Sequence, residues 1–218
     1  MTNLAIFDLD NTLIAGDSDH AWGEFLVNKN LVDSQWYKAQ NDKFYADYCV
    51  GQLDIIAYSE FVFSFLAQHD TAYLQQLHQQ FMSEVIKPIM LPKAQALIAK
   101  HRAEGDELLI ITATNRFITQ PIGEAFGIPQ VLATEPEQIA GRYTGKVSGV
   151  PCYKEGKITR YQAWLAQKMQ SFEQVTFYSD SHNDLPLLKC VDVAIAVDPD
   201  EKLKTYAQQH HWPILSLR

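Results

Sequence analysis

Apolar residues along the chain occur in two patterns, short unbroken runs and longer stretches in which they recur every three or four positions. Unbroken runs are typical of buried strands, and the recurring pattern is typical of helices. The runs predict strands at residues 4–9, 108–112, 131–134, 175–179, 193–197 and 214–217, with a hairpin at 141–145. The recurring stretches predict helices at residues 93–103, 118–126, 158–169 and 203–210. This alternation predicts an α/β fold built on a doubly wound parallel sheet.

A long helical stretch interrupts the alternation between the first and second strands. Apolar residues keep helical spacing over residues 18–89, and Pro88 and Pro92 mark the exit. The candidate N-caps in this stretch are Asp17 or Ser18, and Asp54. Since no strand is predicted here, we expect an inserted all-helical cap domain. The predicted boundaries are residues 15–88 for the cap and residues 1–14 with 89–218 for the α/β core.

The composition is that of an ordinary globular protein with an acidic bias. The 218 residues are 47% hydrophobic and 20% charged, and the formal net charge is −8. Such a chain is a poor candidate for binding nucleic acid, which requires clustered Lys and Arg. Its three Cys, at positions 49, 152 and 190, lack the spacing of a zinc site or a disulfide scaffold. No targeting segment or membrane-spanning run is visible, so we expect a cytoplasmic protein that does not bind membranes.

Most of the negative charge lies in the predicted cap. Residues 15–86 contain seven Asp, three Glu, three Lys and no Arg, and so account for −7 of the net charge. Two interpretations remain open at this point. The acids form a solvated helical surface, which is the usual reason for charge on helices, or they form a surface that binds a cationic ligand.

Two acidic clusters each follow a predicted strand. Asp8 and Asp10 come at the end of the first strand, and Asp180, Asn183 and Asp184 follow the strand at 175–179. The carboxyl ends of parallel strands meet at one edge of the sheet, where α/β folds bind ligands. Carboxylates placed together in this way suit either a hard cation such as Mg²⁺ or a nucleophile with an acid–base partner.

Two further residues are candidates for binding an anion. Thr112 ends the predicted strand at 108–112, where its hydroxyl can bind a phosphate oxygen, although a Thr there is more often part of a turn. Lys157 opens a predicted helix, where the helix dipole disfavours a positive charge. An anionic partner is therefore more plausible for Lys157 than for an ordinary surface Lys.

The order of these elements resembles the haloacid dehalogenase (HAD) superfamily of phosphohydrolases. Residues 7–12 (FDLDNT) match its first motif, and Thr112, Lys157 and the segment 180–184 match the other three in order. The resemblance covers essentially the whole chain. The helical insertion and the segments 196–200 (AVDPD) and 212–215 (WPIL) are similar to the phosphoserine-phosphatase-like branch, which includes histidinol-phosphate phosphatases.

The resemblance implies a role for each motif residue. It implies that Asp8 attacks phosphorus to form an aspartyl-phosphate and that Asp10 serves as general acid and then general base. It implies Mg²⁺ held by Asp8, the backbone carbonyl of Asp10, and Asp180. Thr112 and Lys157 would bind the phosphoryl oxygens. Asn183 and Asp184 would orient the phosphate, Lys157 or a metal-bound water.

The cap is expected to select the substrate. In an ungapped comparison with phosphoserine phosphatases, Asp17 falls where those enzymes have an acid that contacts the substrate amine. Glu60 falls where they have an Arg that contacts the substrate carboxylate, which counts against phosphoserine. We therefore expect an amine-bearing phosphate ester such as histidinol phosphate. The candidates for binding its cationic nitrogens are Asp17, Asp19 and Glu60, and those for stacking on its ring are Trp22, Tyr45, Tyr48, Tyr58 and Phe61.

Several alternatives remain open from the sequence. Phosphoserine or another small metabolite phosphate is the alternative substrate, and transfer to an alcohol in place of water is the alternative reaction. Helix-core packing is the alternative role for each aromatic residue. A receiver-type signalling domain is disfavoured by the length and the helical insertion, and a catalytically inactive binding module by the presence of Asp8, Asp10 and Lys157. The sequence leaves open whether the protein is a monomer or a homodimer.

Overall fold

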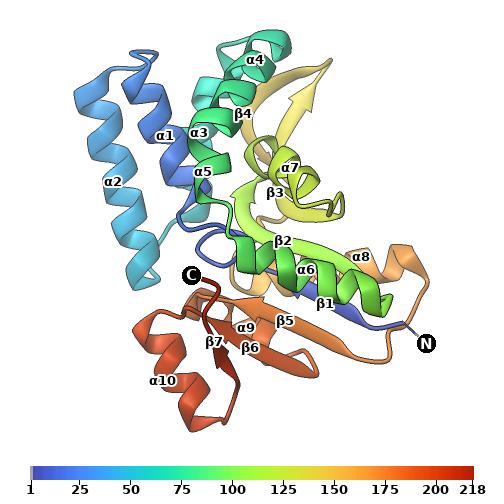
Figure 1. Ribbon diagram of the computed structural model, residues 1–218. Helices are drawn as coiled ribbons and strands as arrows, with labels where there is room; N and C mark the ends of the chain where they lie inside the picture. Colours follow the sequence, from blue (N-terminus) through green and yellow to red (C-terminus); the bar gives the residue numbers. More distant parts are fainter. Residues whose placement is uncertain (1) are drawn as a thin grey trace.

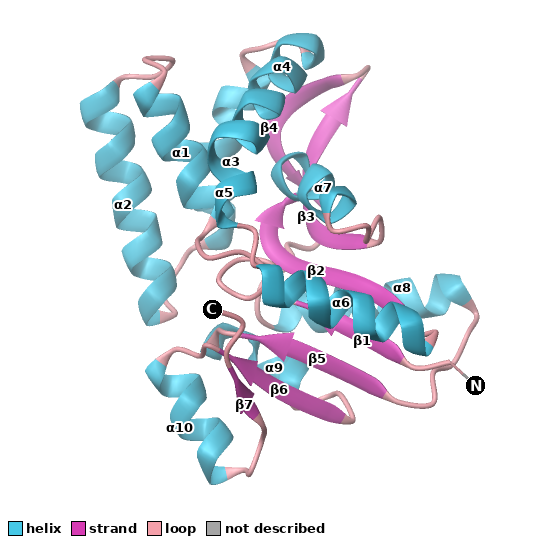
Figure 2. Cartoon of the chain, viewed as in Figure 1, coloured by secondary structure: helices cyan, strands magenta, loops and turns pink. Residues whose placement is uncertain are grey.

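The computed structural model describes residues 2–218 (Figures 1 and 2). Its strands are β1 (Leu4–Phe7), β2 (Glu107–Asn115), β3 (Val131–Ile139), β4 (Arg142–Ser148), β5 (Val175–Ser179), β6 (Val193–Val197) and β7 (Ile214–Leu215). The first helices are α1 (Ser18–Asn28), α2 (Ser34–Val50), α3 (Ile55–Ala67), α4 (Thr71–Phe81), a π-helical turn η1 (Met82–Ile86) and α5 (Lys87–Ile89). The later helices are α6 (Pro92–Glu104), α7 (Arg116–Ala125), α8 (Glu155–Lys168), the 3₁₀ turn η2 (His182–Asp184), α9 (Leu185–Leu188) and α10 (Glu201–Gln209).

The strands form one sheet in the order β4-β3-β2-β1-β5-β6-β7. All neighbouring strands are parallel except β3 and β4, which form a hairpin. Its turn is at residues 140–141, so most of the segment 141–145, where the sequence predicted the hairpin, lies within β4. β1 lies between β2 and β5, so the carboxyl ends of the first, second and fifth strands meet at one edge. The predicted α/β fold with a doubly wound, mostly parallel sheet is confirmed.

Helices cover both faces of the sheet because both faces of its central strand are apolar. Ala5 and Phe7 face a core that includes residues of α6 and α7. Leu4 and Ile6, which alternate with them, face a second core built with residues of α8, α9 and α10. A strand that is buried on both sides in this way has an unbroken run of apolar residues, which explains why the sequence predicts a strand here.

The segments α1 to α5 lie between β1 and β2 in the chain and stand together above the edge of the sheet (Figure 1). Each of the first four helices begins at an aspartate whose side chain accepts backbone N–H groups of the first turn. These N-caps are Asp17, Asp33, Asp54 and Asp70. Helix capping therefore explains part of the acidity of this region, without any ligand.

Among residues 2–218, no helix has the length and apolar character required to cross a membrane.

Candidate active site

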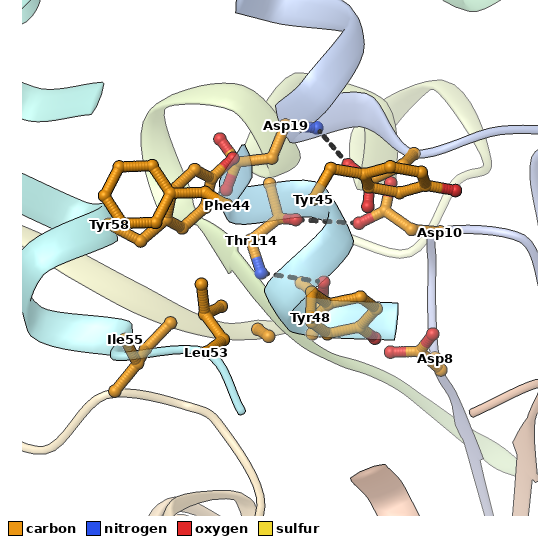
Figure 3. Close-up of a pocket in the computed structure, with 13 residues that line it drawn as sticks. Asp8, Asp10, Asp19, Phe44, Tyr45, Tyr48, Leu53, Ile55, Tyr58 and Thr114 are labelled. Atoms are coloured by element: carbon orange, nitrogen blue, oxygen red, sulfur yellow. Dashed lines mark hydrogen bonds between the residues drawn. The ribbon is translucent and has the colours of Figure 1, made fainter. Parts of the chain in front are cut away.

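The candidate active site begins where β1 ends. The Asp8 backbone N–H donates to the Tyr178 carbonyl at 2.9 Å, so Asp8 continues the pairing of β1 with β5. The next turn closes on the carbonyl of Leu9, which accepts the N–H groups of Thr12, Leu13 and Ile14. Leu9 is fully buried, and this anchors the loop while Asp8 and Asp10 both face one cavity (Figure 3).

Asp8 forms a buried ion pair with Lys157. The Lys157 ammonium lies 2.8 Å from Oδ1 of Asp8 and 2.7 Å from the Asp184 carboxylate, and all three side chains are buried. The Ser179 hydroxyl donates to Asp184 at 2.7 Å. Burial disfavours the charge on Lys157, but the carboxylates of Asp184 and Asp8 outweigh this and raise its pKa. Lys157 is therefore a fixed cation beside Asp8.

Asp10 is held by hydrogen-bond donors and not by a cation. Its Oδ1 accepts the Ser18 backbone N–H at 2.6 Å. Its Oδ2 accepts the Thr114 hydroxyl at 2.8 Å, as Figure 3 shows. Burial, followed by the charge of Asp17, raises the pKa of Asp10 to about 7. Burial also raises the pKa of Asp8 to about 7, against the opposing effect of Lys157. Burial therefore favours the protonated form of both carboxyl groups, and Lys157 opposes this effect at Asp8.

Asp180, at the end of β5, completes the acidic group around Asp8. Its Oδ1 accepts the Thr12 hydroxyl at 3.2 Å. Burial and the charges of Asp8 and Asp184 raise the pKa of Asp180 well above its usual range. Asp8 and Asp184 share the ammonium group of Lys157, and together with Asp180 these carboxylates carry an excess of negative charge when ionised. Oxygen ligands with surplus negative charge fit a hard divalent cation such as Mg²⁺.

The cavity has two kinds of wall. The first is acidic, and the Asn115 amide donates to Asp19 at 3.2 Å on this side. Burial, followed by the charges of Asp17 and Asp10, raises the pKa of Asp19 well above its usual range. The second wall is mostly aromatic and comes from α2, α3 and the segment between them (Figure 3). The lining residues are Asp8, Asp10, Asp17, Asp19, Phe44, Tyr45, Tyr48, Leu53, Ile55, Tyr58, Thr112, Ala113 and Thr114.

The structure thus brings most of the candidate site residues together. Asp8, Asp10, Asp17, Asp19 and Thr112 line one cavity, and Lys157, Asp180 and Asp184 lie directly behind or beside Asp8. The Thr112 hydroxyl accepts the Thr114 backbone N–H at 3.2 Å.

Asn183 lies at a contact between α2 and the loop that follows β5. Its amide donates to the Tyr48 carbonyl at 3.1 Å, and its Oδ1 accepts the Tyr153 hydroxyl at 3.3 Å. It lines a neighbouring cavity that also contains Asp180. Both of its polar groups therefore contact protein and not the cavity of Asp8.

Trp22 and Glu60 lie elsewhere, which corrects the expectation that they contact substrate. Trp22 has no exposed surface and packs among other rings, the nearest being Phe81 and Phe117 at centroid distances of 5.2 and 5.4 Å. Glu60 is exposed on α3 and does not line the cavity. The amphipathic face of each helix determines this: Trp22 is on the core side of α1 and Glu60 is on the solvent side of α3.

Sequence reasoning missed several residues of the site, namely Phe44, Leu53, Ile55, Thr114 and Asn115. Thr114 could have been found, because in an extended strand it lies on the same face as Thr112. Asn115 ends the same strand, and the other three come from two helices and a linker whose relative positions no local pattern determines.

Comparison with known proteins agrees with this geometry. The model of the haloacid dehalogenase-like hydrolase family matches residues 5–189. A histidinol-phosphatase of Neisseria meningitidis serogroup C (strain 8013) is 47% identical over 222 residues, covering 100% of both chains. A phosphoserine phosphatase of Lactococcus lactis subsp. lactis (strain IL1403) is 25% identical, covering 95% of this chain and 88% of the relative.

Solved structures show the same fold. A protein of unknown function from Bordetella pertussis Tohama I has a TM-score of 0.95 at 39% identity, with 100% of both chains covered. A substrate-bound phosphoserine phosphatase has a TM-score of 0.72 at 16% identity, covering 100% of this chain and 94% of that one. The matched family model spans β1, β2, β5 and the motif residues between them. This chain belongs to the haloacid dehalogenase-like hydrolase family.

Proposed function

We propose that the protein is a Mg²⁺-dependent phosphomonoester hydrolase that forms an aspartyl-phosphate on Asp8, with histidinol phosphate as its substrate. The observation that carries the proposal is that Asp8 and Asp10 face one cavity with unlike partners, an ammonium group for Asp8 and neutral donors for Asp10. Two carboxylates in unlike surroundings are suited to two different roles. In this proposal residues 15–88 form a cap over a core of residues 1–14 and 89–218.

The unlike partners define the two steps. An oxygen of Asp8 attacks phosphorus, the bond to the leaving oxygen breaks, and Asp10 donates its proton to the departing alkoxide. Asp10, now ionised, takes a proton from the water that attacks the acyl phosphate, which releases phosphate and restores Asp8. A group that both gives and takes a proton in one cycle works best with a pKa near the working pH, and that of Asp10 is about 7.

Lys157 and Thr112 stabilise the charge that develops on the transferred group. Lys157 is already held 2.8 Å from Asp8, so no reorganisation is needed to place its charge beside the reaction. Thr112 accepts a backbone N–H, and its hydroxyl hydrogen remains available for a phosphoryl oxygen. Asp184 and Ser179 position Lys157.

The proposed metal site consists of the carboxylates of Asp8 and Asp180 with the backbone carbonyl of Asp10. The excess negative charge of Asp8, Asp180 and Asp184 over Lys157 supports it. When bound there, Mg²⁺ would offset the repulsion between the anionic nucleophile and the anionic phosphate. Thr12 orients Asp180 from the protein side through its hydroxyl.

The cavity walls support a substrate with a cationic, ring-bearing leaving group. Asp17 and Asp19 place carboxyl groups close to the catalytic pair, where a cationic nitrogen of the substrate would stabilise their ionised form. Tyr45, Tyr48 and Tyr58 supply faces for a ring. Of the described residues that line the cavity, none is Lys or Arg, so the carboxylate of phosphoserine would meet acids without a cationic partner. The 47% identity to a histidinol-phosphatase supports the same substrate.

Phosphate release with Mg²⁺ from histidinol phosphate, phosphoserine and a panel of metabolite phosphates tests the proposal. We expect kcat/KM for histidinol phosphate to exceed that for phosphoserine by about a hundredfold or more, because unpaired charges in a binding site are strongly discriminating. Histidinol is the control ligand, expected to inhibit competitively. Preference for phosphoserine would overturn the substrate, and activity without any dependence on Asp8 would overturn the mechanism.

A further inference from the structure

We propose that Lys154 and Lys202 are positioning residues that hold the aromatic wall of the cavity in place by binding the C-terminal end of α2. Three backbone carbonyls at this end accept hydrogen bonds from the core. Asn183 donates to Tyr48 O at 3.1 Å, Lys202 to Val50 O at 3.2 Å and Lys154 to Gly51 O at 2.7 Å. We call these three the α2 docking contacts.

The docking contacts come from separate parts of the core. Lys154 precedes α8, Asn183 is in η2, and Lys202 is in α10, which faces the lower end of α2 in Figure 1. The surfaces also approach closely here, since a Cβ built on Gly51 would lie 2.9 Å from Nε2 of His182. Gly51 has φ of 78° and ends the helix in the left-handed conformation, so glycine is required both for the turn and for the close approach.

The charges at this end of α2 favour cations from outside the helix. The last turn of α2 contains Asp47 and no basic residue, although the partial negative charge of a helix C-terminus is stabilised by cations. Lys154 and Lys202 supply the missing positive charge from the core. The docking contacts are therefore complementary in charge as well as in hydrogen bonding.

The backbone of Lys154 is the second observation that points to a specific role. Its φ of 49° and ψ of −121° lie in a region that a residue with a side chain rarely adopts. Such a conformation persists only where the surroundings impose it, and it is found most often at functional sites. Here it accompanies a side chain that reaches across to α2, three residues before the catalytic Lys157.

The docking contacts matter because α2 supplies one wall of the cavity. Phe44, Tyr45 and Tyr48 all come from this helix, and Tyr48 is itself the residue whose carbonyl Asn183 binds. The inference rests on the proposed function in one respect, namely that this wall contacts the leaving group of the substrate. Loss of the contacts would displace the wall without changing Asp8, Asp10 or Lys157.

The test compares Lys154→Met and Lys202→Met with wild type, with Lys154→Arg as the rescue variant and Lys100→Met, an exposed lysine on α6, as the matched control. We expect Lys154→Met to raise KM for histidinol phosphate about three- to tenfold with little change in kcat, which is about the range for loss of one ordinary hydrogen bond. Lys202→Met, which removes a more exposed lysine, should raise KM for histidinol phosphate about twofold. Acetyl phosphate, which lacks the ring and the cationic nitrogens that the α2 wall is proposed to contact, should show no change in KM, and Lys154→Arg should restore most of the affinity for histidinol phosphate.

Hydrogen exchange measured by mass spectrometry provides a readout that does not depend on activity. In Lys154→Met we expect faster exchange confined to residues 44–54 and 180–184, with the sheet unchanged. Unchanged exchange there, or faster exchange throughout the protein with a lower Tm, would overturn the inference. If wild type releases no phosphate from histidinol phosphate, the proposed function fails, while the exchange data still decide whether the lysines hold α2.

Discussion

Thr114 and Asp10 are joined by a hydrogen bond of 2.8 Å from the Thr114 hydroxyl to Oδ2 of the carboxylate. The other oxygen of Asp10 accepts the Ser18 N–H at 2.6 Å, so β2 and the start of α1 together fix the plane of this carboxyl group. Hydrogen bonds to a carboxylate favour its ionised form, whereas burial favours its protonated form. The balance gives Asp10 a pKa of about 7, and Thr114 is part of that balance.

The Thr114→Val variant removes this hydrogen bond while keeping the shape of the side chain. We expect kcat to fall about tenfold with KM nearly unchanged, because a misoriented acid affects proton transfer more than binding. The Thr114→Ser variant, which keeps the hydroxyl, serves as the control and should retain most of the activity. Equal kcat values for the Val and Ser variants would show that the hydroxyl has no role in catalysis.

Asp8→Asn should abolish phosphate release without unfolding the protein. Loss of the nucleophile is expected to lower kcat by about 10⁴-fold or more. Lys157 keeps its bond to Asp184, and the substitution removes one of the three neighbouring carboxylates of Asp8, Asp180 and Asp184, so the Tm should be at least that of wild type. Steady-state kinetics test the loss of kcat, and thermal unfolding tests the Tm. A clean preparation with full activity would contradict the mechanism.

Mg²⁺ should stabilise the folded protein through Asp180. At a concentration about a hundred times its Kd, a ligand that binds only the folded state adds about 2.7 kcal/mol, equivalent to a rise of roughly 5–10 °C in Tm for a chain of this size. We expect this rise in wild type and its loss in Asp180→Asn, with activity removed by a chelator and restored by Mg²⁺. Asp42→Asn, at an exposed acid on α2, is the control. An equal Tm rise in Asp180→Asn would exclude this site.

The parts of the site that the sequence predicts are those fixed by strand ends. Asp8 and Asp180 follow β1 and β5, which are neighbours in the sheet, so the general rule for parallel strands brought them together. Thr114 was missed because the predicted strand stops at residue 112, whereas β2 continues to Asn115. Hydrophobic runs mark only the apolar part of a strand, whereas β2 continues into the site with polar residues, of which Thr114 and Asn115 are buried as well.

The side of the cavity formed by helices could not be predicted in the same way. Glu60 was selected from a sequence comparison without gaps, and Trp22 as an aromatic residue of the same region. A helix makes one turn every 3.6 residues, so a small shift in alignment moves a side chain to another face. The acidity of the helical region was also ambiguous, since four of its acids are N-caps and only Asp17 and Asp19 line the cavity. Packing between helices decides which residues face the substrate.

Glu60→Arg and Asp19→Asn distinguish an acid on the solvent side of a helix from an acid that lines the cavity. Glu60 is exposed and away from the cavity, so Glu60→Arg should leave kcat/KM for histidinol phosphate within about twofold of wild type. Asp19 lines the cavity, and Asp19→Asn should lower kcat/KM about tenfold or more for this cationic substrate while affecting acetyl phosphate little. Parallel kinetics on the two substrates check both. A large effect of Glu60→Arg would mean that α3 presents a different face to the substrate.

His78 should make the stability of the protein depend on pH. It is buried against Trp22, Phe81 and Phe117, and its Nε2–H donates to the Ile118 carbonyl at 3.0 Å. Burial lowers its pKa in the folded state. The charged residues that line the adjoining groove are Lys87, Arg116 and Glu135, the last two paired with each other. The unfolded chain therefore takes up a proton near the ordinary value of 6.5 before the folded protein does.

This order of protonation determines the direction in which stability changes with pH. The stability of wild type should be complete above the unfolded pKa of 6.5 and be lost as the pH falls from there toward the lower folded pKa, with a slope of at most about 1.4 kcal/mol per pH unit for one proton. His78→Gln keeps a donor for Ile118 but cannot be protonated, so it should lack this component. Urea unfolding between about pH 8 and pH 5 measures the difference between the two proteins. Wild type and His78→Gln curves that stay parallel over this range would show that His78 does not titrate on unfolding.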